Sequence, residues 1–253
     1  MSILVVGQSH VAAIRDAARR RREADPERPR TRVIHTLEAR YAPEIESVRG
    51  EGASGARLST SLAAEIAAQI ERHRPMVASC IGGNAHNVLA LLRHPRPFDF
   101  RLPADPDVEP MAGAEPLPVA LVRSALERTM ARDLLRLRLV AAATERLVHI
   151  ESPPPLADAA FIAERADSYF RDRGIDAAAV APAPFRQRMW RLHGSVLREA
   201  CASLGVRFLP VPRAAMDDGG FLRPELAGDA THGNADYGEM LIRGLESMAE
   251  PGA

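Results

Sequence analysis

The sequence predicts an α/β fold in which a parallel sheet lies between two layers of helices. Short aliphatic runs recur along the chain, and amphipathic stretches of helical period separate them. With 253 residues, the chain is also long enough to bury a sizeable core. Strands that alternate with helices form parallel sheets with helices on both faces. Five strands then suit a flavodoxin-like three-layer α/β/α sandwich, and we treat residues 1–253 as one domain.

The strands are predicted from five short runs that are rich in Val, Ile and Leu. The first run, ILVV, begins at Ile3, with no basic segment before it and no cleavage-site pattern after it. We therefore interpret it as a core strand and not as a signal peptide, which favours a cytoplasmic location. The strands are expected at about 3–6, 32–36, 76–81, 146–152 and 206–212.

The helices are predicted from apolar residues at helical spacing. Leu62, Ile66 and Ile70, for example, fall on one face of a helix. The segment 94–110 is rich in Pro and Asp and is predicted to be a loop. The helices are expected at about 10–24, 58–74, 84–93, 118–145, 157–173, 184–204 and 234–248.

Composition and charge exclude several classes of partner. The chain is 46% hydrophobic but only 4% aromatic, its formal charge is zero and its pI is about 7.1. No overall field therefore attracts nucleic acid or an acidic membrane, and no apolar stretch approaches the roughly 20 residues that a membrane helix needs. Cys80 and Cys201, the only cysteines, fall in a predicted strand and a predicted helix, so a disulfide scaffold is not expected.

Three short motifs carry the chemistry. Ser9 ends the first aliphatic run in GQSH, Asn84 follows the third run in IGGN, and Asp229 and His232 lie in DATHGN near the C-terminus. All follow predicted strands, and ligands bind at the carboxyl ends of the strands in such sheets. Together these residues supply a nucleophile, an amide donor and a base with an orienting carboxylate, which serine acyl-transfer chemistry requires.

The order of these motifs resembles the SGNH hydrolase superfamily, also called the GDSL esterases and lipases, over nearly the whole chain. The resemblance implies that Ser9 is the nucleophile and that Asp229 and His232 complete a catalytic triad. It also implies an oxyanion hole formed by the backbone N–H of Ser9, the backbone N–H of Gly55 and the side-chain amide of Asn84.

The nucleophile motif departs from the usual Gly-Asp-Ser-Leu of the family. Gln8 and His10 replace the aspartate and the leucine, and the aspartate normally braces neighbouring loops. Subfamilies with Gly-x-Ser-His include several that act on acylated sugars, so the resemblance points mildly to carbohydrate esters. In the oxyanion loop, Gly52 is an alternative to Gly55.

Each of these residues also has a structural alternative. Ser9 lies where a strand turns into a helix, which is the position of a helix N-cap. Gly55 could be a turn glycine with positive φ. Asp229 and His232 could cap the last helix or order the loop before it.

Three further residues border the predicted site, and we consider His10, Gly83 and His86 as substrate contacts. The chain contains no His-Glu-x-x-His spacing and no paired cysteines, so no catalytic metal is expected. The segment GQSHVAA also lacks the later glycines of Gly-x-Gly-x-x-Gly, and no dinucleotide or other cofactor is expected.

The sequence therefore predicts a serine hydrolase that cleaves short-chain or acetyl oxygen esters of small molecules, with acylated carbohydrates among the candidate substrates. An O-acyltransferase acting on a sugar or lipid hydroxyl would share the first half of the reaction. A catalytically silent glycan or small-ligand binding protein is the alternative from another class. The sequence leaves the acyl chain length, the alcohol, the pathway and the oligomeric state open.

Overall fold

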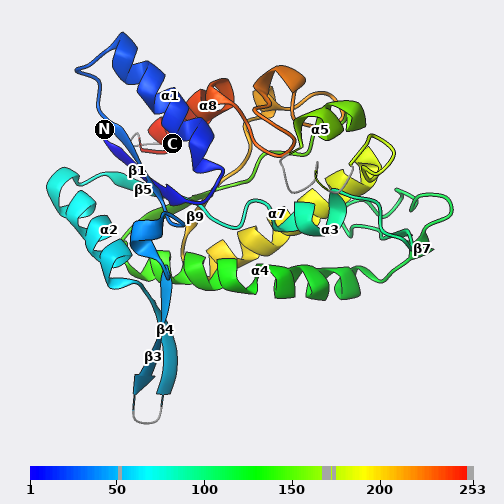
Figure 1. Ribbon diagram of the computed structural model, residues 1–253, viewed down its shortest axis with the longest axis horizontal. Coiled ribbons are helices and arrows are strands. Elements are labelled where there is room, and N and C mark those ends of the chain that lie inside the picture. Colours follow the sequence, from blue (N-terminus) through cyan, green and yellow to red (C-terminus); the bar gives the residue numbers. More distant parts are fainter. Residues whose placement is uncertain (51–52, 167–171, 173–174, 250–253) are drawn as a thin grey trace.

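The structure, a computed structural model, describes residues 1–50, 53–166, 172 and 175–249. At its centre is a five-stranded sheet in which neighbouring strands run parallel (Figure 1). The strands are β1 (Ile3–Gly7), β2 (Thr31–His35), β5 (Met76–Cys80), β8 (Leu147–Ile150) and β9 (Arg207–Leu209), in the order β2-β1-β5-β8-β9. This order confirms the predicted flavodoxin-like α/β/α sandwich.

Alternate residues of β1 face two separate hydrophobic cores. Leu4 and Val6 pack into one core, and Ile3 and Val5 pack into the other. All four side chains are buried, as expected for a central parallel strand that helices cover on both faces. The first core is covered by α2 (Thr60–His73), α4 (Val119–Ala142) and α7 (Ala183–Ser203), and the second by α1 (Val11–Ala24), α5 (Ala159–Arg165) and α8 (Ala235–Ala249).

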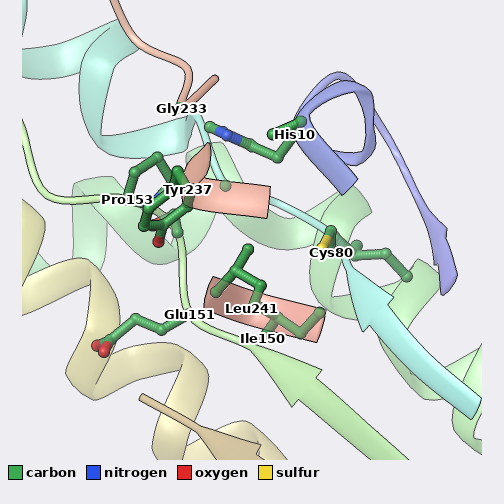
Figure 2. Close-up of a pocket in the computed structure, with 12 residues that line it drawn as sticks. His10, Cys80, Ile150, Glu151, Pro153, Gly233, Tyr237 and Leu241 are labelled. Carbon is green, nitrogen blue, oxygen red and sulfur yellow. The ribbon is translucent and has the colours of Figure 1, made fainter. Parts of the chain in front are cut away.

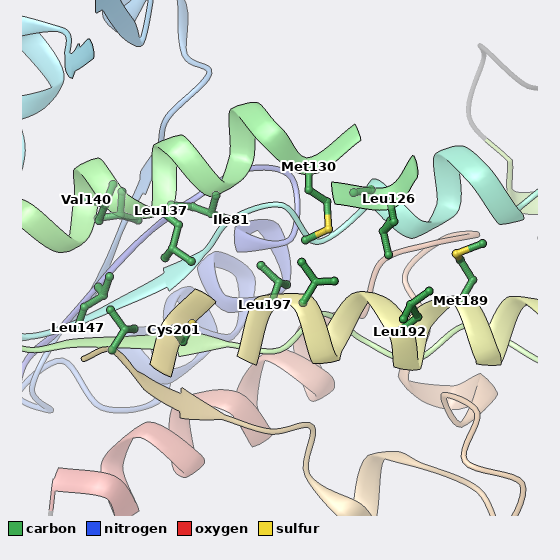
Figure 3. Close-up of a cluster of buried hydrophobic side chains, with 14 of the residues drawn as sticks. Ile81, Leu126, Met130, Leu137, Val140, Leu147, Met189, Leu192, Leu197 and Cys201 are labelled. Atoms are coloured by element: carbon green, nitrogen blue, oxygen red, sulfur yellow. The ribbon is translucent and has the colours of Figure 1, made fainter. Parts of the chain in front are cut away.

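The first core is built mainly from the facing sides of α4 and α7. Leu126, Met130 and Leu137 of α4 and Leu192 and Leu197 of α7 belong to this cluster (Figure 3). Each of these side chains is at most 4% exposed. Burying a side chain of this size contributes about 1.5–3 kcal/mol, so this helix pair is a major source of stability.

The second core joins the two ends of the chain, because α1 packs against α8 (Figure 1). The approach is close at Gly238, where an added Cβ atom would lie 2.1 Å from the carbonyl oxygen of Ala13. Arg21 of α1 forms ion pairs with Glu239 and Glu246 of α8, both at 2.6 Å. This packing brings the N-terminal and C-terminal motifs to the same side of the sheet.

Three segments differ from the predictions. Strands β3 (Ile45–Gly50) and β4 (Ala53–Leu58) form an antiparallel hairpin that projects from the body, where the sequence predicted a loop (Figure 1). The expected loop 94–110 contains β6 (Phe98–Asp99), which pairs with β7 (Glu115–Pro116). The helix expected over 157–173 is α5, which ends at Arg165; residues 167–171 and 173–174 lie outside the described part.

The remaining short elements lie in the connections. They are η1 (Ala39–Tyr41), α3 (Ala85–Ala90), η2 (Arg213–Ala215) and η3 (Pro224–Leu226). None of the helices that the structure describes is long and apolar enough to cross a membrane.

Candidate active site

Three of the predicted motifs meet at the carboxyl edge of the sheet. Ser9 lies in the turn between β1 and α1, and Asn84 lies between β5 and α3. Strands β1 and β5 are neighbours, and the connection from β1 leaves in the opposite direction along the sheet, to β2. Such a switch point opens a crevice between the two loops. His232, which precedes α8, reaches this crevice because α8 packs against α1.

A chain of hydrogen bonds links the serine, the histidine and the aspartate. The Nε2 atom of His232 lies 2.8 Å from Ser9 Oγ, and its Nδ1 atom lies 2.9 Å from Asp229 Oδ2. Ionised carboxylates only accept hydrogen bonds, so the proton of a neutral imidazole belongs on Nδ1. Nε2 is then free to accept the hydroxyl proton of Ser9, which is the arrangement of a general base next to a nucleophile.

The spacing of Asp229 and His232 has a local structural cause. Asp229 Oδ1 accepts hydrogen bonds from the backbone N–H of Thr231 at 2.8 Å and of His232 at 2.9 Å. These bonds close a tight turn that folds the carboxylate onto the imidazole three residues later. Burial raises the pKa of Asp229, but the hydrogen bonds and charge of His232 and the turn outweigh it, and the pKa falls to about 2. The carboxylate therefore stays charged at neutral pH.

Asn84 presents its amide nitrogen to the same point. Its Nδ2 atom lies 3.5 Å from Ser9 Oγ and 3.2 Å from His232 Nε2. Asn87, one helical turn later, donates to the Oδ1 atom of Asn84 at 3.0 Å and so holds the N–H groups toward the serine. Ser9 also stands just before the N-terminus of α1, whose positive end favours a developing anion.

Gly55 is not part of this arrangement. It lies within β4, opposite Val48 in the projecting hairpin, and it is exposed, with open space where a Cβ atom would stand. The expectation that its N–H belongs to the oxyanion hole is therefore wrong, because this glycine occupies a strand and not a loop at the sheet edge. The alternative, Gly52, lies outside the described residues.

Of the three predicted substrate contacts, His86 and Gly83 are buried, whereas His10 is half-buried beside His232, so a substrate contact through His10 stays a prediction. His86 is 2% exposed and its ring packs against that of His193, with centroids 4.9 Å apart, so a substrate contact through His86 is wrong. The ring of His10 packs against that of His232, 4.6 Å away, and its Nε2 atom is buried. A Cβ atom on Gly83 would lie 2.2 Å from the His10 ring, so only glycine permits this approach.

Burial keeps these histidines neutral. Burial and the neighbouring His232 lower the pKa of His10 to about 3, and burial lowers the pKa of His86 well below its ordinary value. No group of three or more His, Cys, Asp or Glu side chains within the described ranges is placed to hold a metal ion. Cys80 and Cys201 are both buried and unpaired, and burial raises the pKa of each thiol to about 12.

A small cavity lies behind the His10 ring, between β5, β8 and α8 (Figure 2). Its lining includes Glu151, Ser152 and Tyr237, and its volume is about 10 Å³. That is roughly the space that one water molecule needs. The cavity is too small for an acyl group, so it is not a substrate pocket.

The sequence motifs did not reveal all the residues that support the site. Gln8 accepts a hydrogen bond from the N–H of Gly82 at 2.8 Å, and His193 of α7 lies 2.8 Å from the Gly82 carbonyl oxygen. Asp133 of α4 accepts a hydrogen bond from Gln8 at 3.3 Å. Gln8 was visible as a departure within its motif, whereas Asp133 and His193 lie in ordinary amphipathic helices without a local signal.

The chain is similar to several solved structures over almost its full length. A GDSL-like lipase from Bacteroides thetaiotaomicron is 12% identical, with 98% of this chain and 89% of that chain covered and a TM-score of 0.45. An acetyl xylan esterase is 8% identical, with 99% and 100% covered and a TM-score of 0.44. The periplasmic domain of a lipopolysaccharide acetyltransferase from Salmonella ser. Paratyphi A is 12% identical, with 98% and 82% covered and a TM-score of 0.45. No protein-family model and no curated protein matches the chain.

Proposed function

We propose that this protein is a serine ester hydrolase of the SGNH type. The observation that carries the proposal is the hydrogen-bonded series Ser9, His232 and Asp229, with distances of 2.8 and 2.9 Å between successive partners. An N-cap serine would need neither an imidazole at its Oγ nor a carboxylate behind that imidazole. The N-cap residue of α1 is His10 and not Ser9.

In the first half-reaction, Ser9 Oγ attacks the ester carbonyl carbon while its proton passes to His232 Nε2. The charged carboxylate of Asp229 stabilises the imidazolium that forms. The proton then goes to the leaving alcohol, and the acyl group stays on Ser9. In the second half, His232 takes a proton from water as the water oxygen attacks the acyl carbon; the bond from that carbon to Ser9 Oγ then breaks, His232 returns the proton to Ser9 Oγ, and the acid leaves.

The tetrahedral intermediates carry a negative oxygen, which Asn84 Nδ2 and the backbone N–H of Ser9 would stabilise. These two donors come from the loops after β5 and β1, on either side of the crevice. The end of α1 adds its positive dipole to them. Gly55 has no part in this proposal, so the oxyanion hole has two donors from the described residues and not the three that the sequence predicted.

A short acyl group on a small polar alcohol, such as an acetylated carbohydrate, is the proposed substrate class. It rests on the resemblance of the Gly-x-Ser-His motif alone. A sugar hydroxyl in place of water in the second half-reaction would make the same site an acyltransferase.

A fluorophosphonate probe tests the nucleophile, because it attaches covalently to an activated serine. We expect labelling of Ser9 in the wild type and none in Ser9→Ala, whereas Ser124→Ala, a matched change at an exposed serine of α4, leaves labelling intact. Labelling that persists in Ser9→Ala would contradict the proposal.

Nitrophenyl esters of graded chain length, with and without sugar acceptors, then test the reaction. We expect turnover that is fastest with the shortest chains and that releases free acid. Acylated sugar as the main product would identify an acyltransferase instead.

A further inference from the structure

The segment that carries Asn84 is held by side chains from two distant parts of the chain. The N–H of Gly82 donates to Gln8 Oε1 at 2.8 Å, and the carbonyl oxygen of Gly82 accepts a hydrogen bond from His193 Nε2 at 2.8 Å. Gly82 has a φ of +74°, in the left-handed region that favours glycine. The two peptide groups that flank Gly82 are therefore both fixed, two residues before Asn84.

The direction of both hydrogen bonds is determined by their surroundings. Gln8 Nε2 donates to Asp133 Oδ1 at 3.3 Å, and Arg136 forms an ion pair with the same carboxylate. Because a carboxylate only accepts, the oxygen of the Gln8 amide must face the N–H of Gly82. His193 is fully buried, and burial lowers its pKa to about 4, so the ring is neutral and carries a single N–H. Because the Gly82 carbonyl oxygen only accepts hydrogen bonds, that N–H belongs on Nε2.

These contacts matter because Gly82 and Gly83 have no side chains to anchor them. Two consecutive glycines allow more backbone conformations than any other pair. The position of the Asn84 amide relative to Ser9, 3.5 Å away, thus depends on groups outside the loop.

We propose that Gln8 and His193 are positioning residues that place the Asn84 amide for the oxyanion. Gln8 would thereby brace this loop in place of the aspartate that usually stands at its position in the Gly-Asp-Ser-Leu motif, in concert with His193 from α7. This inference rests on the proposed function, in which Asn84 donates to the oxyanion.

The test replaces each positioning side chain and measures steady-state ester hydrolysis. Gln8→Leu and His193→Phe remove the hydrogen bonds and keep most of the volume. A misplacement of about 1 Å in a catalytic group costs about 100-fold in rate, so we expect kcat to fall about 10- to 100-fold, with KM changed less than about 3-fold. His193→Gln retains an N–H donor and should restore most of kcat.

His149→Phe is the matched control, since it makes the same change at another fully buried histidine. His149 bonds to Ser79 at 2.8 Å, and no hydrogen bond among the described residues joins it to Gly82. We expect it to lower stability without lowering kcat. Equal losses of kcat in His149→Phe and His193→Phe would overturn the inference, because a general loss of packing would then explain both.

A double-mutant comparison separates positioning from direct catalysis. In the Asn84→Ala background the amide is absent, so His193→Phe and Gln8→Leu should each cost less than about 3-fold in kcat. If the losses of kcat in His193→Phe and Gln8→Leu instead multiplied with the loss in Asn84→Ala, the two side chains would not act through Asn84, and the inference would be wrong.

Hydrogen exchange of the Gly82 N–H gives a readout that does not need activity. We expect exchange to be at least about 10-fold faster in Gln8→Leu than in the wild type, and unchanged exchange would contradict the inference. The wild type could form this hydrogen bond and yet neither hydrolyse esters nor react with fluorophosphonate. In that case the proposed function would be wrong, and the positioning role of Gln8 and His193 in catalysis would be wrong with it.

Discussion

Acid should destabilise this protein well above the pH at which carboxylates are protonated, because three imidazoles are deeply buried. His86, His149 and His193 are 2%, 0% and 0% exposed. Burial lowers the pKa of His149 to about 3 and of His193 to about 4, and it lowers the pKa of His86 well below its ordinary value. In the unfolded chain the same groups titrate near 6.5.

Proton linkage gives the sign and the size of this loss of stability. As pH falls below about 6.5, the unfolded state binds protons that the folded state does not, so the free energy of unfolding decreases until the pH nears the lowered pKa values, about 4 for His193 and about 3 for His149. At pH 5.5 each such imidazole costs about 1.4 kcal/mol, so these three cost about 4 kcal/mol together, and His10, whose pKa is also lowered to about 3, adds a similar share. That is a large part of the roughly 5–15 kcal/mol that stabilises a typical domain.

Urea unfolding followed by circular dichroism at pH 8 and at pH 5.5 measures this loss. The two values avoid most of the carboxylate titration; the pKa of Glu239, for example, is lowered to about 2 by its hydrogen bond with Arg21. His149→Phe should reduce the loss by about one quarter, since it removes one of four such imidazoles. His94→Gln changes an exposed histidine and is the control, which should leave the loss as in the wild type. A loss below about 1 kcal/mol in the wild type would refute the reasoning.

Three further predictions concern the site and its support. Asn84→Ala should lower kcat about 10²- to 10³-fold with little change in KM, as loss of one oxyanion donor does; a change confined to KM would make Asn84 a substrate-binding residue. His232→Ala should abolish nearly all ester turnover, Asp229→Asn should impair it severely, and the double variant should be about as slow as His232→Ala, since parts of one catalytic unit are not additive. If the two losses in kcat/KM multiplied, the pair would not act together. Gly238→Ala should destabilise the fold by about 1–3 kcal/mol, because the new Cβ atom would lie 2.1 Å from the Ala13 carbonyl oxygen; an unchanged thermal midpoint would contradict this.

The strands of the central sheet were predictable because helices cover both of its faces. Burial on both sides requires unbroken aliphatic runs such as ILVV, and these runs stand out from their neighbours. The β3–β4 hairpin gave no such signal, since Glu46 and Arg57 face solvent and pair with one another across the two strands. Its pairing arises from contacts between strands and not from an apolar pattern.

The same distinction holds for the candidate site, where residues next to an element boundary were predictable and residues placed by tertiary packing were not. Ser9, Asn84 and the Asp229–His232 turn each adjoin a strand or helix boundary, so the sequence could place them at one edge. The prediction for Gly55 was wrong because a glycine in a polar segment gives the same sequence signal in a loop and in an exposed strand. His193 could not be found, because its contact with Gly82 depends on how α7 packs over the sheet.

The hydrogen bond between Ser9 and His232 joins residues that are 223 positions apart. During synthesis, Ser9 leaves the ribosome long before His232 is added, so a growing chain carries the nucleophile without its base. Closing so long a loop costs conformational entropy that contacts between nearby residues avoid, so we expect this contact to form late in refolding. Esterase activity would therefore report completion of the whole fold, and recovery of activity should lag behind recovery of helical signal.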